Sequence, residues 1–347
     1  MQFGLQYFPV ATEAKSTAQY FSECLDLAQE ADDLGFTHAR IVEHYFHRYG
    51  GSSPNPLVFL AALAQRTRHM RLVTGAILPV FNNPLKLAGE IGMVDAISGG
   101  RLDVGIARAF LPHEFRRFKI SPDESQARFK EGIEQIDLLL REENVSHQGQ
   151  FHSFEDITSR PRPTQKPRPK FFVAATQTAE TFEYAGRNGH SLMAIPIGPI
   201  KPLLETYRKA WKDAGHPGDG EIMVAFHMFC HEDGATAREI ARAPYNMYFE
   251  ALNECVSEWA RRPASKDYRG YDNQARSLER ASLESQIETG GAWVGSPQEI
   301  ISTINRVRER IGPFEIASVQ VNFGDLDYAP ARASMQLFAR EVMPRFT

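Results

Sequence analysis

The stretch RLVTGAILPVFNNPLKLAGEIGMVDAISGGRLDVGIAR, residues 71–108, predicts a strand, a helix and a second strand. Arg71–Leu78 and Leu102–Arg108 are short runs of strand-forming residues that are apolar on both faces. Pro84–Ile97 lies between them and is predicted to be helical. Strands that are apolar on both faces and alternate with helices are typical of a parallel sheet covered by helices.

The same alternation extends over the whole chain. Further strands are predicted at Gln2–Val10, His38–Glu43, Lys170–Ala175, His190–Ile195, Ile222–Cys230 and Ser318–Phe323. Further helices are predicted at Ser16–Leu34, Pro56–Arg66, Asp123–Arg141, Thr178–Asn188, Lys201–Ala214, Gly234–Arg262, Pro297–Ile311 and Ala329–Pro344. About eight such units in 347 residues fit a (β/α)8 TIM barrel better than an open sheet.

Two polar stretches interrupt this alternation, one after strand 4 and one after strand 7. The first, Glu142–Pro169, contains several prolines. The second, Pro263–Gly291, is charged and is predicted to be a mobile lid over the barrel mouth that excludes water. A passive surface insertion is the alternative. The chain is therefore predicted to be one α/β domain, residues 1–347, with two insertions.

Composition excludes several classes of protein. With 39 Lys and Arg against 43 Asp and Glu, the formal charge of −4 argues against a nucleic-acid partner. No apolar run is long enough for a transmembrane helix, and no basic region precedes Lys15 as in a signal peptide. Cys24, Cys230 and Cys255 lie too far apart for a disulfide framework or a thiolate metal site, as expected of a cytoplasmic protein. The absence of phosphate-loop and G-x-G-x-x-G motifs argues against kinases, ATPases and Rossmann dehydrogenases.

In a barrel of this kind the site lies where the strands end and their following loops begin. The positions expected there are Phe8-Pro9, Glu43–Phe46, Gly75–Ile77, Arg108–Phe110, Thr176–Thr178 and Ile195–Ile197. Aromatic and aliphatic walls with one histidine, one arginine and hydroxyl groups suit a large, flat, partly apolar ligand with an anionic end.

Arg108, Thr176 and Thr178 are candidates for a phosphate site. A guanidinium together with hydroxyl and N–H groups at a helix N-terminus binds phosphate well. The equally weighted alternative is a helix-capping threonine and an arginine paired with a carboxylate. Asn322 and Gly324 lie at the end of the last predicted strand, so the position that barrels more often use for phosphate remains an alternative.

His44 is a candidate general acid or base, because imidazole titrates near neutral pH and this residue follows a strand. A histidine that is merely hydrogen-bonded into the barrel rim is the alternative. Glu43, His44 and His47 do not have the spacing of a helical zinc motif, so no metal site is expected.

The helix around Leu57–Ala64 is apolar around its whole circumference. An outer barrel helix normally keeps a polar face, so we expect a partner subunit to cover this one in a homodimer. Burial under a long loop of the same chain is the alternative.

Five segments occur in a characteristic order: MQFGLQYF, GFTHARIVEHYF, SPNPLVFLAALAQRTRHMRLVTGAILPVFNNPLKLAGEIGMVDAISGGRLDVGIAR, VGSPQEIISTI and ARASMQLFAREVMP. In this order they resemble the bacterial luciferase-like flavin monooxygenases, and in particular the luciferase catalytic subunit, nearly end to end. The resemblance implies a (β/α)8 barrel, reduced FMN (FMNH2) as cofactor, and oxygenation through a flavin C4a-(hydro)peroxide.

The resemblance also implies roles for single residues. His44 matches the histidine needed for chemistry, and Gly75-Ala76 matches an unusual peptide bend, expected to be cis, on which the flavin rests. Arg108 matches the arginine that holds the flavin phosphate. The cofactor-binding residues implied or adjoining are Gly75, Ala76, Arg108, Phe110, Ala175, Thr176, Gln177 and Thr178, and the expected substrate-pocket residues are Phe8, Tyr45 and Ile195.

Three positions depart from the luciferase pattern: Tyr45 replaces a histidine, Ala107 a cysteine and Ala175 a glutamate. These changes put light emission in doubt, although not oxygen chemistry.

The function expected from this resemblance is a two-component monooxygenase that acts on a small or carrier-bound aldehyde, ketone or acyl compound. Since no nicotinamide fingerprint is present, a separate NAD(P)H:flavin reductase is expected as partner. Two alternatives are an F420-dependent hydride-transfer oxidoreductase and a non-catalytic flavin-binding subunit.

Overall fold

Eight parallel strands close into a barrel in the computed structural model, which describes residues 1–196, 198–261, 265–271 and 281–346. Each strand pairs with the next around the ring, and β9 closes it by pairing with both β8 and β11. In ring order the strands are β1 (Gln2–Tyr7), β2 (His38–Ile41), β3 (Arg71–Thr74), β4 (Leu102–Ile106), β7 (Phe171–Ala175), β8 (Ser191–Ala194), β9 (Ile222–Cys230) and β11 (Ile316–Gln320). The predicted (β/α)8 barrel is confirmed.

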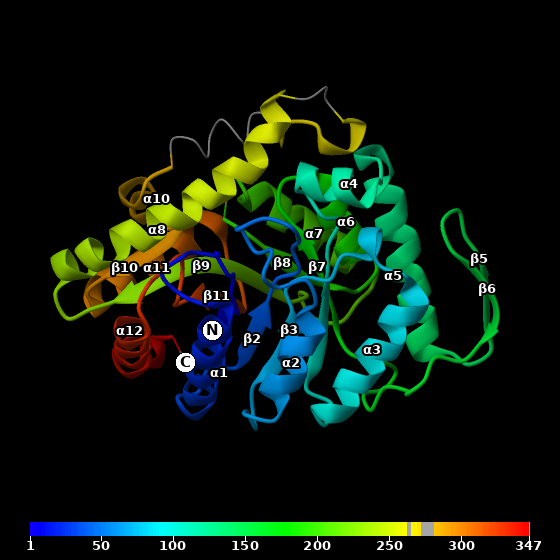
Figure 1. Ribbon diagram of the computed structural model, residues 1–347, viewed down its shortest axis with the longest axis horizontal. Coiled ribbons are helices and arrows are strands. Elements are labelled where there is room, and N and C mark those ends of the chain that lie inside the picture. The colour runs from blue at the N-terminus through cyan, green and yellow to red at the C-terminus, as the bar shows by residue number, and fades with distance from the viewer. Residues whose placement is uncertain (197, 262–264, 272–280, 347) are drawn as a thin grey trace.

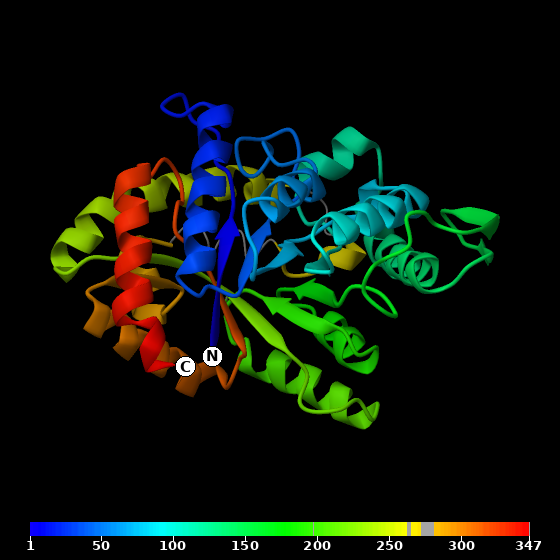
Figure 2. The same cartoon turned by 90° about the horizontal axis from the view of Figure 1, so that it is seen from below.

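Helices surround the barrel (Figures 1 and 2). They are α1 (Thr17–Asp33), α2 (Pro56–Ala64), α3 (Pro84–Ile97), α5 (Ser125–Arg141), α6 (Ala179–Arg187), α7 (Lys201–Asp213), α8 (Gly234–Val256), α11 (Pro297–Ile311) and α12 (Tyr328–Glu341). Helices α2 and α3 begin with an Asn-Pro pair, in which the Asn55 or Asn83 side chain accepts a hydrogen bond from the backbone two residues on. Proline at the first helical position needs no hydrogen-bond partner, so both starts are well defined.

The insertion after strand 4 has more structure than the sequence predicted. A short helix, α4 (Pro112–Phe118), follows β4 directly, and the polar stretch contains a hairpin of β5 (Val145–Gln148) and β6 (Ser153–Ile157). This hairpin projects from the side of the barrel (Figure 1). The Glu131 carboxylate on α5 accepts backbone hydrogen bonds from residues 150–152, which fixes the hairpin turn to the helix.

The insertion after strand 7 corrects two predictions. Helix α8 ends at Val256 and passes into a 3-10 turn, η3 (Ser257–Arg261), so the predicted helix to Arg262 was too long. Beyond it lie η4 (Lys266–Tyr268), α10 (Leu283–Thr289) and an unpredicted strand, β10 (Ala292–Gly295), which pairs with the end of β9. The predicted lid, 263–291, includes residues 263–264 and 272–280, which lie outside the described residues.

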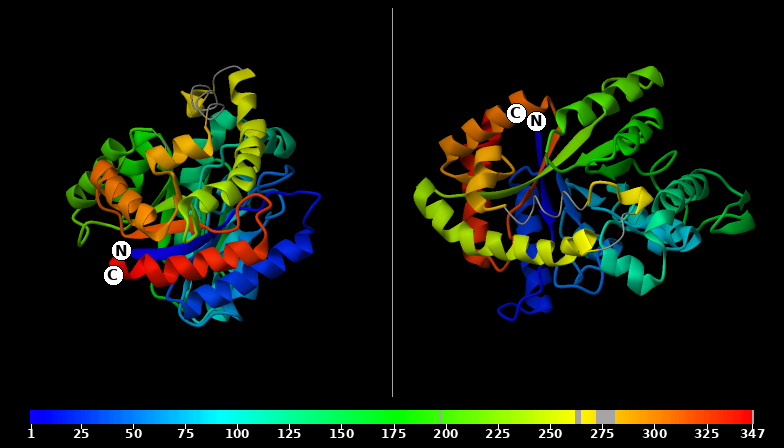
Figure 3. Two further views of the ribbon diagram at one scale, coloured as in Figure 1. Left: turned by 90° about the vertical axis from the view of Figure 1, so that its left-hand side faces the viewer. Right: turned by 90° about the horizontal axis from the view of Figure 1, so that it is seen from above.

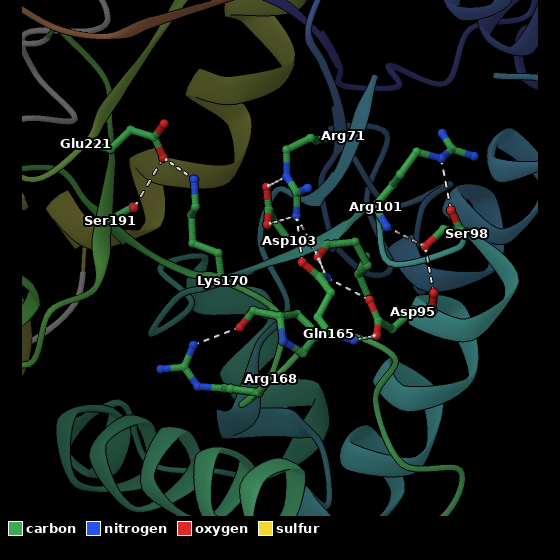
Figure 4. A network of polar contacts seen from close by, with 12 residues as sticks. Arg71, Asp95, Ser98, Arg101, Asp103, Gln165, Arg168, Lys170, Ser191 and Glu221 are labelled. Atoms are coloured by element: carbon green, nitrogen blue, oxygen red, sulfur yellow. Dashed lines mark hydrogen bonds and ion pairs between the residues drawn. The ribbon is translucent and has the colours of Figure 1, made fainter. Parts of the chain in front are cut away.

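The amino ends of the strands are closed by a polar network (Figure 4). Arg71, at the start of β3, binds both carboxylate oxygens of Asp103 at 2.5 Å, and Lys170 beside β7 lies 2.8 Å from Glu221. The two termini also meet at this end, where the Met1 ammonium group donates to the Phe346 carbonyl over 2.7 Å (Figure 3). Within the described ranges, no helix has the length and apolar composition needed to cross a membrane.

Helix α2 is covered more fully by its own chain than the sequence suggested. Leu60 and Leu63 are fully buried against neighbouring elements, whereas Val58 is 69 % exposed. On the adjoining helix α3, Met93 is 51 % and Ile97 41 % exposed. Three exposed apolar side chains on two adjoining helices, Val58, Met93 and Ile97, therefore remain instead of an entirely uncovered helix; we call them the apolar patch.

Candidate active site

The peptide bond between Gly75 and Ala76, directly after β3, is cis, as the resemblance implied. The side chain of Arg40 on the neighbouring strand β2 passes close to it. A Cβ atom on Gly75 would lie 3.2 Å from the Arg40 Cβ, Cγ and Cδ atoms. A larger residue here would crowd the Arg40 stem, which would have to shift by a few tenths of an ångström.

His44 follows β2 and is held by a carboxylate. Its Nδ1 lies 3.1 Å from Oε1 of Glu114, which also accepts the backbone N–H of Tyr45 at 2.9 Å. The Phe8 and Phe110 rings pack against the imidazole with centroid distances of 5.3 and 5.7 Å. A carboxylate at Nδ1 favours the tautomer with the proton on that atom, so Nε2 is left for proton exchange with a ligand.

Glu114 was missed by the sequence analysis. It is fully buried on α4, and its second oxygen, Oε2, has no hydrogen-bond partner among the described residues. The sequence LPHEF, residues 111–115, carries a signal, because a proline followed two positions later by a glutamate is typical of a helix start.

Glu43, beside His44, is also buried. It accepts hydrogen bonds from the Tyr45 hydroxyl at 2.5 Å, the Asn82 amide at 2.8 Å and the Leu78 backbone at 3.2 Å. Burial raises the pKa of this carboxyl group to about 8, although these three donors oppose the increase. The side chain ties the loops after β2 and β3 together.

An aromatic wall lies beside His44. The Phe8 ring lies 4.2 Å from the tilted Tyr49 ring and 5.5 Å from the edge-on Tyr248 ring of α8, and the two tyrosine hydroxyls are 3.1 Å apart. His227 of β9 packs 4.6 Å from the Tyr248 ring, its Nε2 has no partner within the described part of the chain, and burial lowers its pKa to about 3. Helix α8 runs across the carboxyl ends of the strands (Figure 3), so it brings this unpredicted wall to the site.

Arg108 and Thr176 come together because β4 and β7 are neighbours in the barrel. Both contact residues 265–271, which we call the cover segment. Arg108 donates to the Asp267 carbonyl at 3.2 Å and lies 5.1 Å from the centre of the Tyr268 ring. The Thr176 and Tyr271 hydroxyls are 3.1 Å apart.

The alternative interpretation of this cluster is found only in part, because Thr178 is the N-cap residue of α6. Over the described ranges, no carboxylate pairs with Arg108, and Thr178 starts α6 without a side-chain capping bond. The amide Nε2 of Gln177 is buried and also lacks a partner there. An arginine, two hydroxyls, a free amide and a helix start are donors that a phosphate group accepts, so these residues fit the phosphate of FMN.

The position after the last strand, which barrels more often use to bind phosphate, is occupied by contacts within the protein. Asn322 donates to the Cys24 sulfur at 3.1 Å. A Cβ atom on Gly324 would lie 2.1 Å from the Pro244 carbonyl oxygen, because the backbone of α8 lies directly against this glycine.

The remaining predicted residues do not all lie together. Ala175 ends β7 and is buried, and Phe110 contacts His44. The Tyr45 hydroxyl donates to Glu43, and its ring packs 4.9 Å from the Phe118 ring. Ile195 directly follows β8 and is 41 % exposed.

The metal interpretation of Glu43, His44 and His47 has no support in the geometry. Across the part of the chain that the structure describes, no three His, Cys, Asp or Glu side chains gather as metal ligands. His47 instead accepts the backbone N–H of Tyr49 at 3.1 Å and lies 2.9 Å from the Cys255 sulfur.

Comparison with known proteins shows the family of the chain. The family model described as luciferase-like monooxygenase matches residues 1–313. The oxygenase component of a flavin-dependent trigonelline monooxygenase from Acinetobacter baylyi is 30 % identical over 97 % of this chain and 92 % of its own. The alpha chain of alkanal monooxygenase from the Kryptophanaron alfredi symbiont is 24 % identical over 99 % and 98 %.

Solved structures give the same result. The monooxygenase RslO1 from Streptomyces bottropensis is 42 % identical, with a TM-score of 0.89 over the whole of both chains. The oxygenating constituent of 3,6-diketocamphane monooxygenase from Pseudomonas putida, solved with FMN, is 23 % identical and has the same fold, with a TM-score of 0.84 over 100 % of this chain and 99 % of its own. The chain therefore belongs to the luciferase-like monooxygenase family, and the predicted enzyme class, a flavin-dependent monooxygenase, is confirmed.

Proposed function

We propose that this chain is the oxygenase component of a two-component system that uses reduced FMN and O2 to oxygenate an organic substrate. The observation that carries this proposal is the donor cluster of Arg108, Thr176, Gln177 and Thr178 at the adjoining ends of β4 and β7. Three relatives support the proposal. The trigonelline monooxygenase relative is named as an oxygenase component, and the 3,6-diketocamphane monooxygenase was solved with FMN. An FMNH2-dependent dimethylsulfone monooxygenase is 24 % identical to this chain. A separate flavin reductase would supply the reduced cofactor.

Reduced FMN, when bound, supplies the electrons that reduce O2, so that one oxygen atom can be transferred to the substrate. The chain's own residues bind and orient the reactants. Arg108 and the Thr176–Thr178 backbone hold the phosphate, while Gly75 and Ala76 provide a side-chain-poor surface for the flat ring. His44, fixed through Nδ1 by Glu114, holds or delivers a proton at Nε2.

The organic substrate is proposed to lie against the aromatic wall of Phe8, Tyr49, Tyr248 and His227. Aromatic rings offer apolar contact to a carbon skeleton, while the two hydroxyls and the free Nε2 of His227 are able to bind a carbonyl oxygen. This combination suits an aldehyde, a ketone or an acyl compound.

The cover segment is proposed to be the inner edge of a lid. Tyr268 donates to the Ala109 carbonyl at 2.8 Å and is buried, although the surrounding sequence is polar. Its neighbour Asp267 accepts from the backbone of Gln126 at 2.9 Å, which attaches the segment to α5. The segment therefore lies over Arg108, where it would keep water from the bound cofactor.

The proposed function is tested by mixing the anaerobic complex of protein and reduced FMN with oxygenated buffer and following absorbance. We expect oxidised FMN to appear only after a slower, spectrally distinct phase, and O2 consumption to yield product with an aldehyde or ketone. Direct formation of free oxidised FMN without product would contradict the proposal. Reduction of F420 by an alcohol without O2 uptake would support hydride transfer, and tight flavin binding without turnover would support a non-catalytic subunit.

Arg108→Gln is expected to weaken binding of reduced FMN by about 10- to 100-fold, because a bidentate, charge-assisted contact contributes roughly 1.5–3 kcal/mol. Binding of reduced riboflavin, which has no phosphate, should stay within about twofold. Both affinities are measurable by anaerobic titration. Equal losses for the two flavins would show that Arg108 does not bind the phosphate.

His44→Ala is expected to leave FMN affinity nearly unchanged and to lower coupled product formation by about 10²-fold or more, with hydrogen peroxide released instead. His216→Ala, on the outer surface near α7, is the matched control and should behave like the wild type. Coupling is measured as product formed per O2 consumed. Unchanged coupling in the His44 variant would remove this residue from the mechanism.

The apolar patch of Val58, Met93 and Ile97 is proposed to be part of a homodimer interface. Val58→Glu combined with Met93→Glu should convert a dimer into a monomer, because each carboxylate would be buried without a partner. Light scattering after size-exclusion chromatography measures the mass, and Ile195→Glu provides a control at an exposed apolar residue elsewhere. A dimer that survives the double substitution places the interface on another surface.

A further inference from the structure

Arg40 is a buried cation whose partners are all neutral. It lies on β2 inside the barrel and is 7 % exposed. Its guanidinium donates to the Ser318 hydroxyl at 2.8 Å, the Gly75 carbonyl at 3.4 Å and the Gln6 side-chain oxygen, and contacts the Met193 sulfur at 3.3 Å. No carboxylate in the described ranges pairs with it, and burial lowers its pKa to about 10.

Such an arrangement opposes folding, because a buried charge without a countercharge loses hydration that neutral groups replace only in part. The chain has organised acceptors around this cation. Gln6 directs its oxygen to Arg40 while its own amide lies 3.4 Å from the Gln320 oxygen, and the Gln320 amide donates to the Phe8 carbonyl at 3.3 Å. The positive charge is therefore held in place without being neutralised.

The charge lies at the boundary between the barrel interior and the mouth. The Arg40 stem passes Gly75, and its guanidinium donates to the carbonyl of that same residue, which begins the cis peptide. Arg108 is positioned separately, at the end of β4 beside β7 and the cover segment. Arg108 and Arg40 are thus separate buried cations, one at the proposed phosphate site and the other beside the proposed ring site.

We propose that Arg40 is the residue whose positive charge binds the anionic form of the reduced flavin ring, and that it thereby determines how strongly the protein prefers reduced to oxidised FMN. This inference rests on the proposed function. The oxidised ring is neutral, whereas the two-electron-reduced ring loses a proton readily and then carries a negative charge. Poor solvent screening around Arg40 strengthens its attraction for that anion.

Preference for reduced FMN determines the order in which the cofactor is bound and released in the two-component reaction. The protein takes up the cofactor in the form that a reductase delivers and releases it after oxidation. Binding of the anion also supplies the countercharge that Arg40 lacks in the free protein.

The test compares dissociation constants of the full-length protein for oxidised FMN and for anaerobically reduced FMN at pH 8. In Arg40→Met we expect affinity for reduced FMN to fall at least tenfold, while affinity for oxidised FMN changes less than threefold. A tenfold loss corresponds to a midpoint potential of bound FMN that is about 30 mV lower. Arg40→Lys keeps the charge and should retain most of the preference.

Gln6→Glu is the second variant, because it places a carboxylate against Arg40 with almost no change in shape. We expect affinity for reduced FMN to fall at least tenfold, because the new carboxylate supplies the countercharge that the anionic ring would otherwise provide. If Arg40 has a purely structural role, Arg40→Met should lower the affinities for oxidised and reduced FMN equally, and Gln6→Glu should leave the affinity for reduced FMN unchanged. Either result would overturn the inference. If the wild type binds FMN in neither redox state, the proposed flavin function itself fails.

Discussion

The closure of the barrel by β9 is the constraint on which the site depends. Its first residues pair with β8 through Ile222–Val224, and an overlapping stretch, Met223–His227, pairs with β11. Because every strand in the ring is parallel, this closure brings all carboxyl ends to one rim. Residues as distant in sequence as His44, Arg108 and Thr176 then face the same opening, and α8, which follows β9, is delivered across it.

The sequence predicted the parts of the site that follow strands directly. Arg108 and Thr176 each come one or two residues after an apolar strand, so their place on the rim follows from the strand order. Glu114 could not be placed in this way, because it lies in a short helix whose contact with His44 depends on how the loop folds back. Arg40 was hidden for another reason: it alternates with Ala39 and Ile41 in β2, and because all four residues of this short strand are buried, the sequence does not show which face lies inside the barrel.

The insertion after strand 7 shows that polar composition alone does not predict which residues of a segment are buried. The stretch predicted as lid is too polar to form a core of its own, yet Tyr268, Tyr271 and Leu283 within it are buried. Tyr268 and Tyr271 lie 5.0 Å apart and meet Arg108 and Thr176, so their burial arises from covering the rim. Only a three-dimensional contact reveals this role, because neither local periodicity nor composition distinguishes it from a surface loop.

Two pairs of cations, one pair at each end of the barrel, differ in the charge of their partners. At the amino end, Arg71 and Lys170 are paired with Asp103 and Glu221, an arrangement that serves stability. At the carboxyl end, Arg40 and Arg108 are both buried and, among the described residues, both bind only neutral acceptors. Unpaired buried cations are unfavourable unless an anion joins them. Reduced FMN carries negative charge in two separate places, its phosphate and its ring, so a single ligand of this kind would satisfy both arginines at once.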